Sequence, residues 1–262
     1  MMAALAAYLG CVRRTNRDSV TRNAFSLARK ALAAVLVSVA CRPAAQGINP
    51  ESQPARRISI DVREASPLQA DLYGAGGRGV VIFAHGGYST RLSWAPQAKR
   101  IAGAGFRVLV VEARAAAELA SGRETPCLYD EGCLAKDVLA SVRYLRTLGV
   151  DSIALMGGSM GGGAVAQASV EAEPGQIQHI VLLAPATIAA PERIQGHKLF
   201  IMTREDANAA GPRLPGILAQ FERTLEPKRL VVLEGAAHAQ RIFSTGDGDA
   251  VMQDILAFLR AR

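Results

Sequence analysis

The sequence predicts one α/β domain built on a mostly parallel β-sheet of about eight strands with helices on both faces. From Arg57 onward, short apolar runs rich in β-branched residues alternate with segments of helical period, which is typical of βαβ units. The strand runs are almost continuously apolar, as expected for parallel strands that are buried on both faces. The chain has 262 residues and half of them are hydrophobic, so it is long and apolar enough to close a full core.

The predicted elements follow one another along the chain as short apolar strands and longer helical segments. An antiparallel edge pair is expected at 57–63 and 68–73. It is followed by strand 79–84, a helix near 91–104, strand 106–111, a helix near 131–148, strand 152–156, a helix from 160, strands 179–183 and 198–202, a helix near 213–223, strand 229–233 and a helix near 249–260. The segment 74–79 fits G-x-G-x-x-G, but it precedes a strand and opens no helix, so we interpret it as a turn and not as a dinucleotide site.

The net charge of +7 is concentrated at the N-terminus. Residues 1–40 hold six basic side chains and one acidic side chain, which leaves only +2 on the other 222 residues. An apolar run of ten residues, 31–40, directly follows Arg29-Lys30, as in the hydrophobic region of a secretory signal peptide. It is too short for a membrane-spanning helix, which needs roughly 20 apolar residues. We therefore expect an N-terminal extension with a signal peptide at 1–40, a linker at 41–56 and the folded domain at 57–262.

The segment before Cys41 also resembles a bacterial lipoprotein signal, in which that cysteine is lipidated. Ser38 and Ala40 are small residues at the −3 and −1 positions of a cut after Ala40, although Ser38 stands where lipoproteins usually carry an aliphatic residue. These features predict an exported protein that is periplasmic or anchored to the membrane through Cys41. The alternative is a buried N-terminal helix in a cytoplasmic protein. Because the domain itself carries little net charge, no nucleic-acid partner is expected.

The most informative motif is the stretch 156–163, Met-Gly-Gly-Ser-Met-Gly-Gly-Gly. It contains G-x-S-x-G at Gly157, Ser159 and Gly161, directly after one predicted strand and at the start of a helix. A serine held on such a tight turn projects its hydroxyl above the C-terminal edge of the sheet. The amide of Met160 begins the helix and points an unpaired N–H toward whatever Ser159 attacks. This pattern predicts a nucleophilic serine.

The general base is chosen from only four histidines. It must approach from the same sheet edge as Ser159, at the C-terminal end of a strand. His179 and His197 enter strands from the opposite edge, whereas His238 follows the last strand and is our candidate. The orienting acid is expected at an intervening strand end, where Asp206 is the first choice, Glu205 its immediate rival and Glu192 a distant third.

The order Ser159, Asp206, His238 resembles that of the α/β-hydrolases, over roughly residues 57–262. The element His85-Gly86-Gly87 after strand 79–84 fits the same resemblance. It implies that the amides of Gly87 and Met160 form an oxyanion hole, while His85 supports the loop. The nucleophile differs from the cysteine of dienelactone hydrolases, whose compact architecture is otherwise similar.

The resemblance implies a serine esterase that cleaves a small-molecule ester through an acyl-enzyme, without a cofactor or metal. The alternatives are an acyltransferase or peptidase that uses the same three residues, and a catalytically silent binding protein of this fold. The histidines are scattered and the cysteines lack metal-ligand spacing, which is the reason that no metal site is expected.

The substrate pocket is expected to be open. Only about 15 residues, 184–197, separate strands 179–183 and 198–202, where many relatives insert a lid. Tyr88 and Arg114 are the candidate substrate-binding residues. In an exported protein Cys127 and Cys133 would form a disulfide beside the site, whereas in a cytosolic protein they would be buried thiols.

Overall fold

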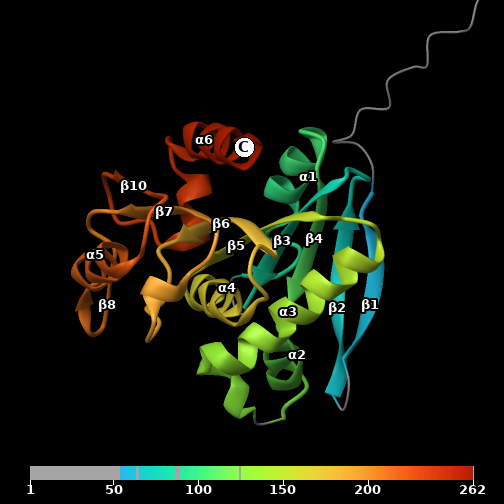
Figure 1. Cartoon of the computed structure of the whole chain (residues 1–262). Coiled ribbons are helices and arrows are strands. Elements are labelled where there is room, and N and C mark those ends of the chain that lie inside the picture. Colours follow the sequence, from blue (N-terminus) through green and yellow to red (C-terminus); the bar gives the residue numbers. More distant parts are fainter. Residues whose placement is uncertain (1–53, 63–64, 86–88, 124, 262) are drawn as a thin grey trace, which may run out of the picture. The chain divides into compact units, whose positions relative to one another are not determined.

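The computed structural model describes residues 54–62, 65–85, 89–123 and 125–261, all of which belong to the unit Gln46–Arg262 (Figure 1). The predicted signal peptide at 1–40, Cys41 and most of the predicted linker lie outside the described residues. The folded domain begins with a strand at Arg56, one residue before its predicted start, because Arg56 already pairs with Leu72 of the next strand.

An eight-stranded sheet forms the centre of the domain, in the order β1-β2-β4-β3-β5-β6-β7-β10. The strands are β1 (Arg56–Val62), β2 (Ala65–Tyr73), β3 (Arg78–Ala84), β4 (Arg107–Glu112), β5 (Ser152–Gly158), β6 (Ile177–Leu183), β7 (His197–Thr203) and β10 (Lys228–Leu233). β2 pairs antiparallel with both β1 and β4, and every other pairing in this sheet is parallel. The predicted α/β class, the strand number and the antiparallel edge pair are therefore confirmed.

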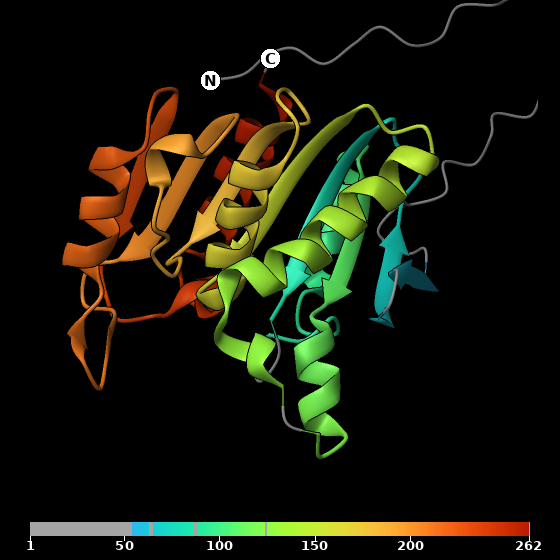
Figure 2. The ribbon, with the colours of Figure 1, turned by 60° about the horizontal axis from the view of Figure 1, so that its bottom comes forward.

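Helices cover both faces of this sheet, as predicted. They are α1 (Ala95–Gly103), α2 (Arg114–Ala120), α3 (Glu131–Thr147), α4 (Met160–Glu171), α5 (Leu214–Arg223) and α6 (Gly248–Arg260). In Figure 1, α1 and α6 lie on one face and α3 and α4 on the other. Figure 2 shows α3 and α4 side by side in front of the strands, and these two helices are in extensive contact. Between β6 and β7 the chain forms only the short 3-10 helix η3 (Pro191–Arg193), so no large cap is present.

The central strands carry the core. Val80–Ala84 of β3 and Ile180–Leu183 of β6 have fully buried side chains, and β4, β5 and β7 are nearly as apolar and buried. Burial of a large apolar side chain contributes roughly 1.5–3 kcal/mol, so these strands form a firm support for the loops at their ends.

Two predicted boundaries moved for local reasons. β2 starts at Ala65 and includes Pro67, which is tolerated because β2 pairs with β4 only from Ala70 onward, so no bond to that neighbour is lost. The helix predicted near 91–104 begins only at Ala95. The segment before it is a turn in which Thr90 and Ser93 exchange side-chain and backbone hydrogen bonds, and Pro96 lies in the first turn of the helix.

The sequence analysis missed α2 and a small hairpin. α2 has the sequence RAAAELA, whose residues favour helix, but no helix is predicted between strand 106–111 and the helix near 131–148. The hairpin consists of β8 (Ala207–Asn208) and β9 (Gly211–Pro212), two strands that are too short to show any apolar alternation. The hairpin lies next to the site described below, because Ala207 lines its cavity.

Candidate active site

The site lies where the strand order reverses. The chain passes from β3 to β4 on one side, and then returns to place β5 on the other side of β3. In an open α/β sheet this switch point leaves a crevice beyond the carboxyl ends of the two central strands. His85 follows β3 and Ser159 follows β5, so the topology places both residues at that crevice.

Ser159 occupies a strained turn between β5 and α4. Its φ is 54° and its ψ is −124°, a conformation that costs of order 1–3 kcal/mol for a residue other than glycine. The surrounding backbone holds it there. Its N–H donates to the carbonyl of Leu183, and its own carbonyl accepts from the amides of Gly163 and Ala186 at 3.0 and 2.8 Å.

The glycines around Ser159 are required by close backbone contacts. A Cβ on Gly157 would lie 2.3 Å from the carbonyl oxygen of Gly161, and a Cβ on Gly161 would lie 2.7 Å from that of Phe83. Real Cβ atoms do not approach so closely. The G-x-S-x-G pattern thus reports the tight crossing of β5, α4 and the end of β3, which is the arrangement that exposes the serine.

His238 and Asp206 meet above the same sheet edge. His238 lies beyond β10, just before the 3-10 helix η4 (Ala239–Ser244), and Asp206 lies beyond β7. His238 Nδ1 donates to Asp206 Oδ2 at 2.6 Å, and Asp206 is only 1% exposed. Of the rival acids, Glu205 is exposed, and Glu192 pairs with Arg223 at 2.9 Å. The structure therefore places Asp206 against the imidazole.

Ser159 and His238 line one cavity of about 730 Å³. Its wall is mixed, with two arginines, several small polar side chains and an apolar corner. The lining residues include His85, Ser89, Ser93, Pro96, Gln97, Arg213, Gln240, Arg241, Phe243 and Ser244. Ser93 Oγ donates to Gln240 Oε1 at 3.0 Å, which ties the loop after β3 to the loop after β10.

Backbone strain is concentrated around this cavity. In the part of the chain that the structure describes, three residues other than glycine have a positive φ: Ser159, Ala184 and Ala239. Ala184 directly follows β6, and Ala239 directly follows His238. All three lie just beyond strand ends at the C-terminal edge, where the sheet holds loops in costly conformations.

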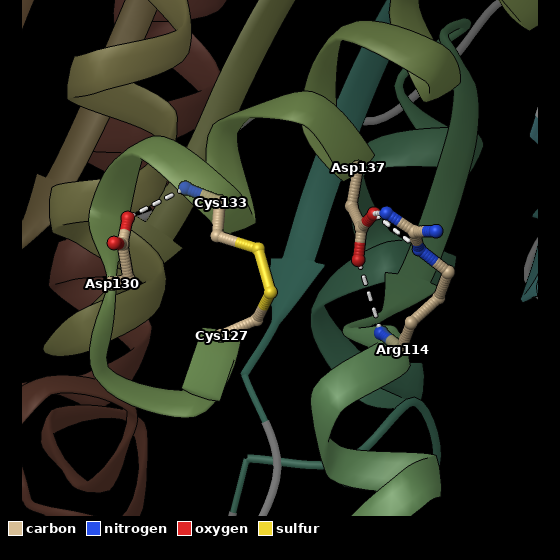
Figure 3. Close-up of a disulfide and its surroundings, with 5 residues drawn as sticks. All are labelled: Arg114, Cys127, Asp130, Cys133 and Asp137. Atoms are coloured by element: carbon tan, nitrogen blue, oxygen red, sulfur yellow. Dashed lines mark hydrogen bonds and ion pairs between the residues drawn. A yellow bond between two sulfur atoms is a disulfide. The ribbon is translucent and has the colours of Figure 1, made fainter. Parts of the chain in front are cut away.

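A disulfide-closed loop contacts the other side of the site. Cys127 and Cys133 are joined, and the Asp130 side chain between them accepts a hydrogen bond from the Cys133 amide at the start of α3 (Figure 3). The carbonyl of Leu128 accepts a hydrogen bond from His85 Nε2 at 2.5 Å. His85 is thus held by the loop through its ring.

Several of the expected site residues lie elsewhere or outside the described residues. Arg114 does not line the cavity of Ser159. Its guanidinium lies 2.6 Å from Asp137 Oδ1, and Figure 3 shows the two side chains paired. Burial keeps the pKa of the Asp137 carboxyl above its ordinary value despite this ion pair. Arg114 lines a separate pocket with Arg91 and Glu112, and its role in substrate binding stays a prediction. Gly87 and Tyr88 lie outside the described residues.

The two remaining histidines lie at the opposite edge of the sheet, as expected. His179 and His197 lie opposite each other on adjacent strands, with tilted rings whose centroids are 5.2 Å apart. Burial, with smaller contributions from His197 and Arg78, lowers the pKa of His179 to about 4. His179 is therefore neutral near pH 7 and far from Ser159 in the fold.

Sequence reasoning missed much of the cavity wall. Gln240 and Phe243 come shortly after His238 in the sequence. This short spacing from the proposed base was a signal that could have identified them as cavity residues. Arg213 is different, because only the unpredicted hairpin brings it back to the site.

The described residues contain neither a cluster of metal ligands nor a membrane-spanning helix. Within them, no group of three or more His, Cys, Asp or Glu side chains is arranged to hold a metal ion. No helix in the same ranges has the length and apolar character needed to cross a membrane.

Comparison with known families and structures agrees with this architecture. A family model described as alpha/beta hydrolase fold matches residues 79–240, which include Ser159, Asp206 and His238. A search of curated proteins found no match.

Solved structures with the same architecture include a dienelactone hydrolase and two esterases. A dienelactone hydrolase from Anabaena variabilis is 24% identical with a TM-score of 0.63, over 79% of this chain and 97% of that one. An esterase from Pyrococcus furiosus is 18% identical with a TM-score of 0.62, over 80% of this chain and 93% of that one. An esterase from Pyrobaculum calidifontis is 17% identical with a TM-score of 0.61, over 79% and 85%. At these identities the likeness establishes the fold alone.

Proposed function

The chain belongs to the α/β-hydrolase fold family, and on that premise we propose that it is a serine hydrolase that cleaves a carboxylic ester. The observation that carries the proposal is one arrangement of three residues. A serine on a strained turn shares a cavity with a histidine whose far nitrogen is bound by a buried carboxylate.

The hydrogen bond from His238 to Asp206 supports the role of the histidine as general base. Because Nδ1 carries the donated proton, the lone pair of the neutral imidazole is on Nε2. Nε2 takes the proton of Ser159 Oγ as that oxygen attacks the ester carbonyl. Asp206 then stabilises the imidazolium that results.

The remaining steps follow from the same groups. The tetrahedral intermediate collapses when the bond to the alcohol oxygen breaks, and His238 returns its proton to that oxygen. Water then enters, His238 removes a proton from it, and the second tetrahedral intermediate releases the acid and restores Ser159. The amide of Met160, in the first turn of α4, has no intrahelical acceptor and is a donor for the oxyanion. We propose the amide of Gly87 as the second donor, by family resemblance.

The form of the cavity supports a small substrate. In the part of the chain that the structure describes, no cap domain covers it, and its wall combines Phe243 and Pro96 with hydroxyl and amide side chains. Such a wall suits a short acyl or alcohol group that carries polar substituents better than a long hydrocarbon chain.

The test is hydrolysis of p-nitrophenyl esters of increasing chain length by the full-length chain and by Ser159→Ala. We expect activity on the shorter esters, and a loss of at least about 10³-fold in the variant. Equal rates for the two proteins would refute the mechanism. Labelling by a fluorophosphonate probe separates this proposal from a silent binding protein, which would remain unlabelled when folded. Added alcohol acceptors and a peptide substrate would detect an acyltransferase or a peptidase.

We further propose that the protein is exported. The disulfide between Cys127 and Cys133 supports this, because such bonds persist mainly in oxidising compartments. The apolar segment 31–40 provides the signal, and lipidation of Cys41 would anchor the mature protein. Fractionation of cells that express the full-length chain or Cys41→Ala tests both points. Full-length precursor that remains in the cytoplasm would contradict export, and an unchanged membrane fraction for Cys41→Ala would contradict lipidation.

A further inference from the structure

The hairpin after β7 returns the chain to the proposed orienting acid. β8 and β9 pair antiparallel between Asp206 and Arg213, so these two residues meet at the open end of the hairpin. The backbone amide of Arg213 donates to the carbonyl of Asp206 at 2.9 Å. The side chains meet as well, because Arg213 Nε lies 3.5 Å from Asp206 Oδ1.

The two carboxylate oxygens of Asp206 have different surroundings. Oδ2 accepts the hydrogen bond of His238, whereas Oδ1 is buried and accepts none from any residue that the structure describes. A buried carboxylate oxygen without compensation is costly, since its charge has lost the stabilisation of water. The nearest compensation is the positive charge of Arg213, whose side chain is about 30% exposed and also lines the cavity of Ser159.

We infer that Arg213 is a positioning residue, which holds the carboxylate of Asp206 turned so that Oδ2 faces His238. The inference rests on the proposed function, because it assigns the support of the same site. Among the described residues, the other charged and titratable groups that line the cavity with His238 are His85 from the loop after β3 and Arg241 from η4, while Glu205 beside Asp206 is exposed. Arg213 forms an ion pair with Asp206.

Two consequences follow from the charge and from the contact. The guanidinium opposes a second positive charge on His238, so its removal favours the imidazolium and moves the acidic limb of the pH profile to higher pH. Loss of the contact frees the carboxylate to rotate, which misorients the base and lowers kcat more than it raises KM.

The experiment compares full-length wild type, Arg213→Gln, Arg213→Lys and Arg204→Gln with p-nitrophenyl acetate, a neutral ester. Arg204 is the matched control, because it lies in the same segment and pairs with Glu234 on the surface. We expect Arg213→Gln to lose about tenfold in kcat with little change in KM. The acidic limb of its pH profile should lie at higher pH than that of wild type. Arg213→Lys should return the acidic limb of the pH profile to its wild-type position. Arg204→Gln should match wild type in kcat and in pH profile. A wild-type kcat and pH profile in Arg213→Gln would overturn the inference.

A second readout does not depend on turnover. The proton between His238 Nδ1 and Asp206 Oδ2 is expected as a far-downfield signal in the proton NMR spectrum, assigned by its loss in His238→Gln. Arg213→Gln should weaken or shift this signal, whereas Arg204→Gln should leave it in place. If the wild type neither hydrolyses esters nor reacts with fluorophosphonate, the proposed function fails, and the signal still decides on Arg213: an unchanged signal in Arg213→Gln overturns the inference.

Discussion

His238 donates a hydrogen bond to Asp206 across 2.6 Å, although 32 positions separate the two residues along the chain. The bond exists because the parallel strands β7 and β10 are neighbours and end at the same edge of the sheet. Its energetic importance comes from its surroundings, since Asp206 is almost completely buried.

Replacement of Asp206 by Asn should lower kcat by roughly 10³- to 10⁴-fold, because an amide no longer holds the imidazole in the useful tautomer. Glu205→Gln is the matched control, since Glu205 is adjacent but exposed, and it should keep near wild-type rates. Steady-state hydrolysis of p-nitrophenyl acetate measures both. A larger loss of kcat in Glu205→Gln than in Asp206→Asn would show that Asp206 is not the orienting acid.

Replacement of Ser159 by Gly should remove the activity and increase the free energy of unfolding. Glycine adopts φ 54° without the steric cost that Ser159 experiences, so a gain of about 1 kcal/mol is expected. Ser159→Ala keeps the strain and serves as the comparison. Urea unfolding followed by circular dichroism measures the difference. If Ser159→Gly is no more stable than Ser159→Ala, then the turn is not strained as described.

Replacement of Gly157 by Ala should destabilise the domain by about 1–3 kcal/mol, because the added methyl group meets the backbone of Gly161 at 2.3 Å. Gly77→Ala is the control, since no atom lies within 4 Å of its Cβ position. Thermal unfolding of the two variants should differ clearly. Equal melting temperatures would count against the close crossing of β5 and α4.

The double substitution Cys127→Ser, Cys133→Ser should lower the free energy of unfolding by about 2 kcal/mol, as the chain-entropy model gives for so short a loop. Reductant should not change the free energy of unfolding of this variant, whereas it should lower that of wild type by a similar amount. Urea titrations with and without dithiothreitol make the comparison. If reductant leaves the wild-type unfolding curve in place, the bond does not contribute.

Stability should fall as the pH drops from about 6.5 to about 4, partly because of His179. Its pKa is about 4 in the folded protein and near 6.5 when unfolded, so the unfolded chain binds the extra proton throughout this window. The loss due to His179 is roughly 2 to 3 kcal/mol by pH 4. His179→Leu should flatten this part of the pH dependence, and His197→Gln should change it less, because His197 makes only a smaller contribution to the lowered pKa of His179. An unaltered slope in His179→Leu would show that other groups are responsible.

The positions of Ser159 and His238 were accessible from the sequence because each depends on a local pattern. The glycines around Ser159 are visible in the chain, and they reflect contacts within one strand, turn and helix. His238 was selected because only four histidines exist and strand direction separates them into two edges. The short apolar runs in the sequence likewise located all eight strands of the main sheet, because strands in a sheet that is covered on both faces are apolar along their length.

The choice among acids and the surroundings of Arg114 were decided only by the tertiary structure. Asp206 and Glu205 are adjacent and chemically alike, and the direction in which each side chain points depends on the hairpin that follows them. Arg114 was expected at the substrate, but α3 presents Asp137 to it, a contact between segments that no local pattern encodes.

The sequence by itself determined the α/β class, the strained serine turn and the histidine at the matching sheet edge, because these follow from residue type and short-range spacing. Only the tertiary structure decided which carboxylate meets His238, where the arginines lie, and that Arg213 reaches Asp206. The physical reason is that these side-chain partnerships join distant segments whose relative positions are set by packing of the whole sheet and its helices.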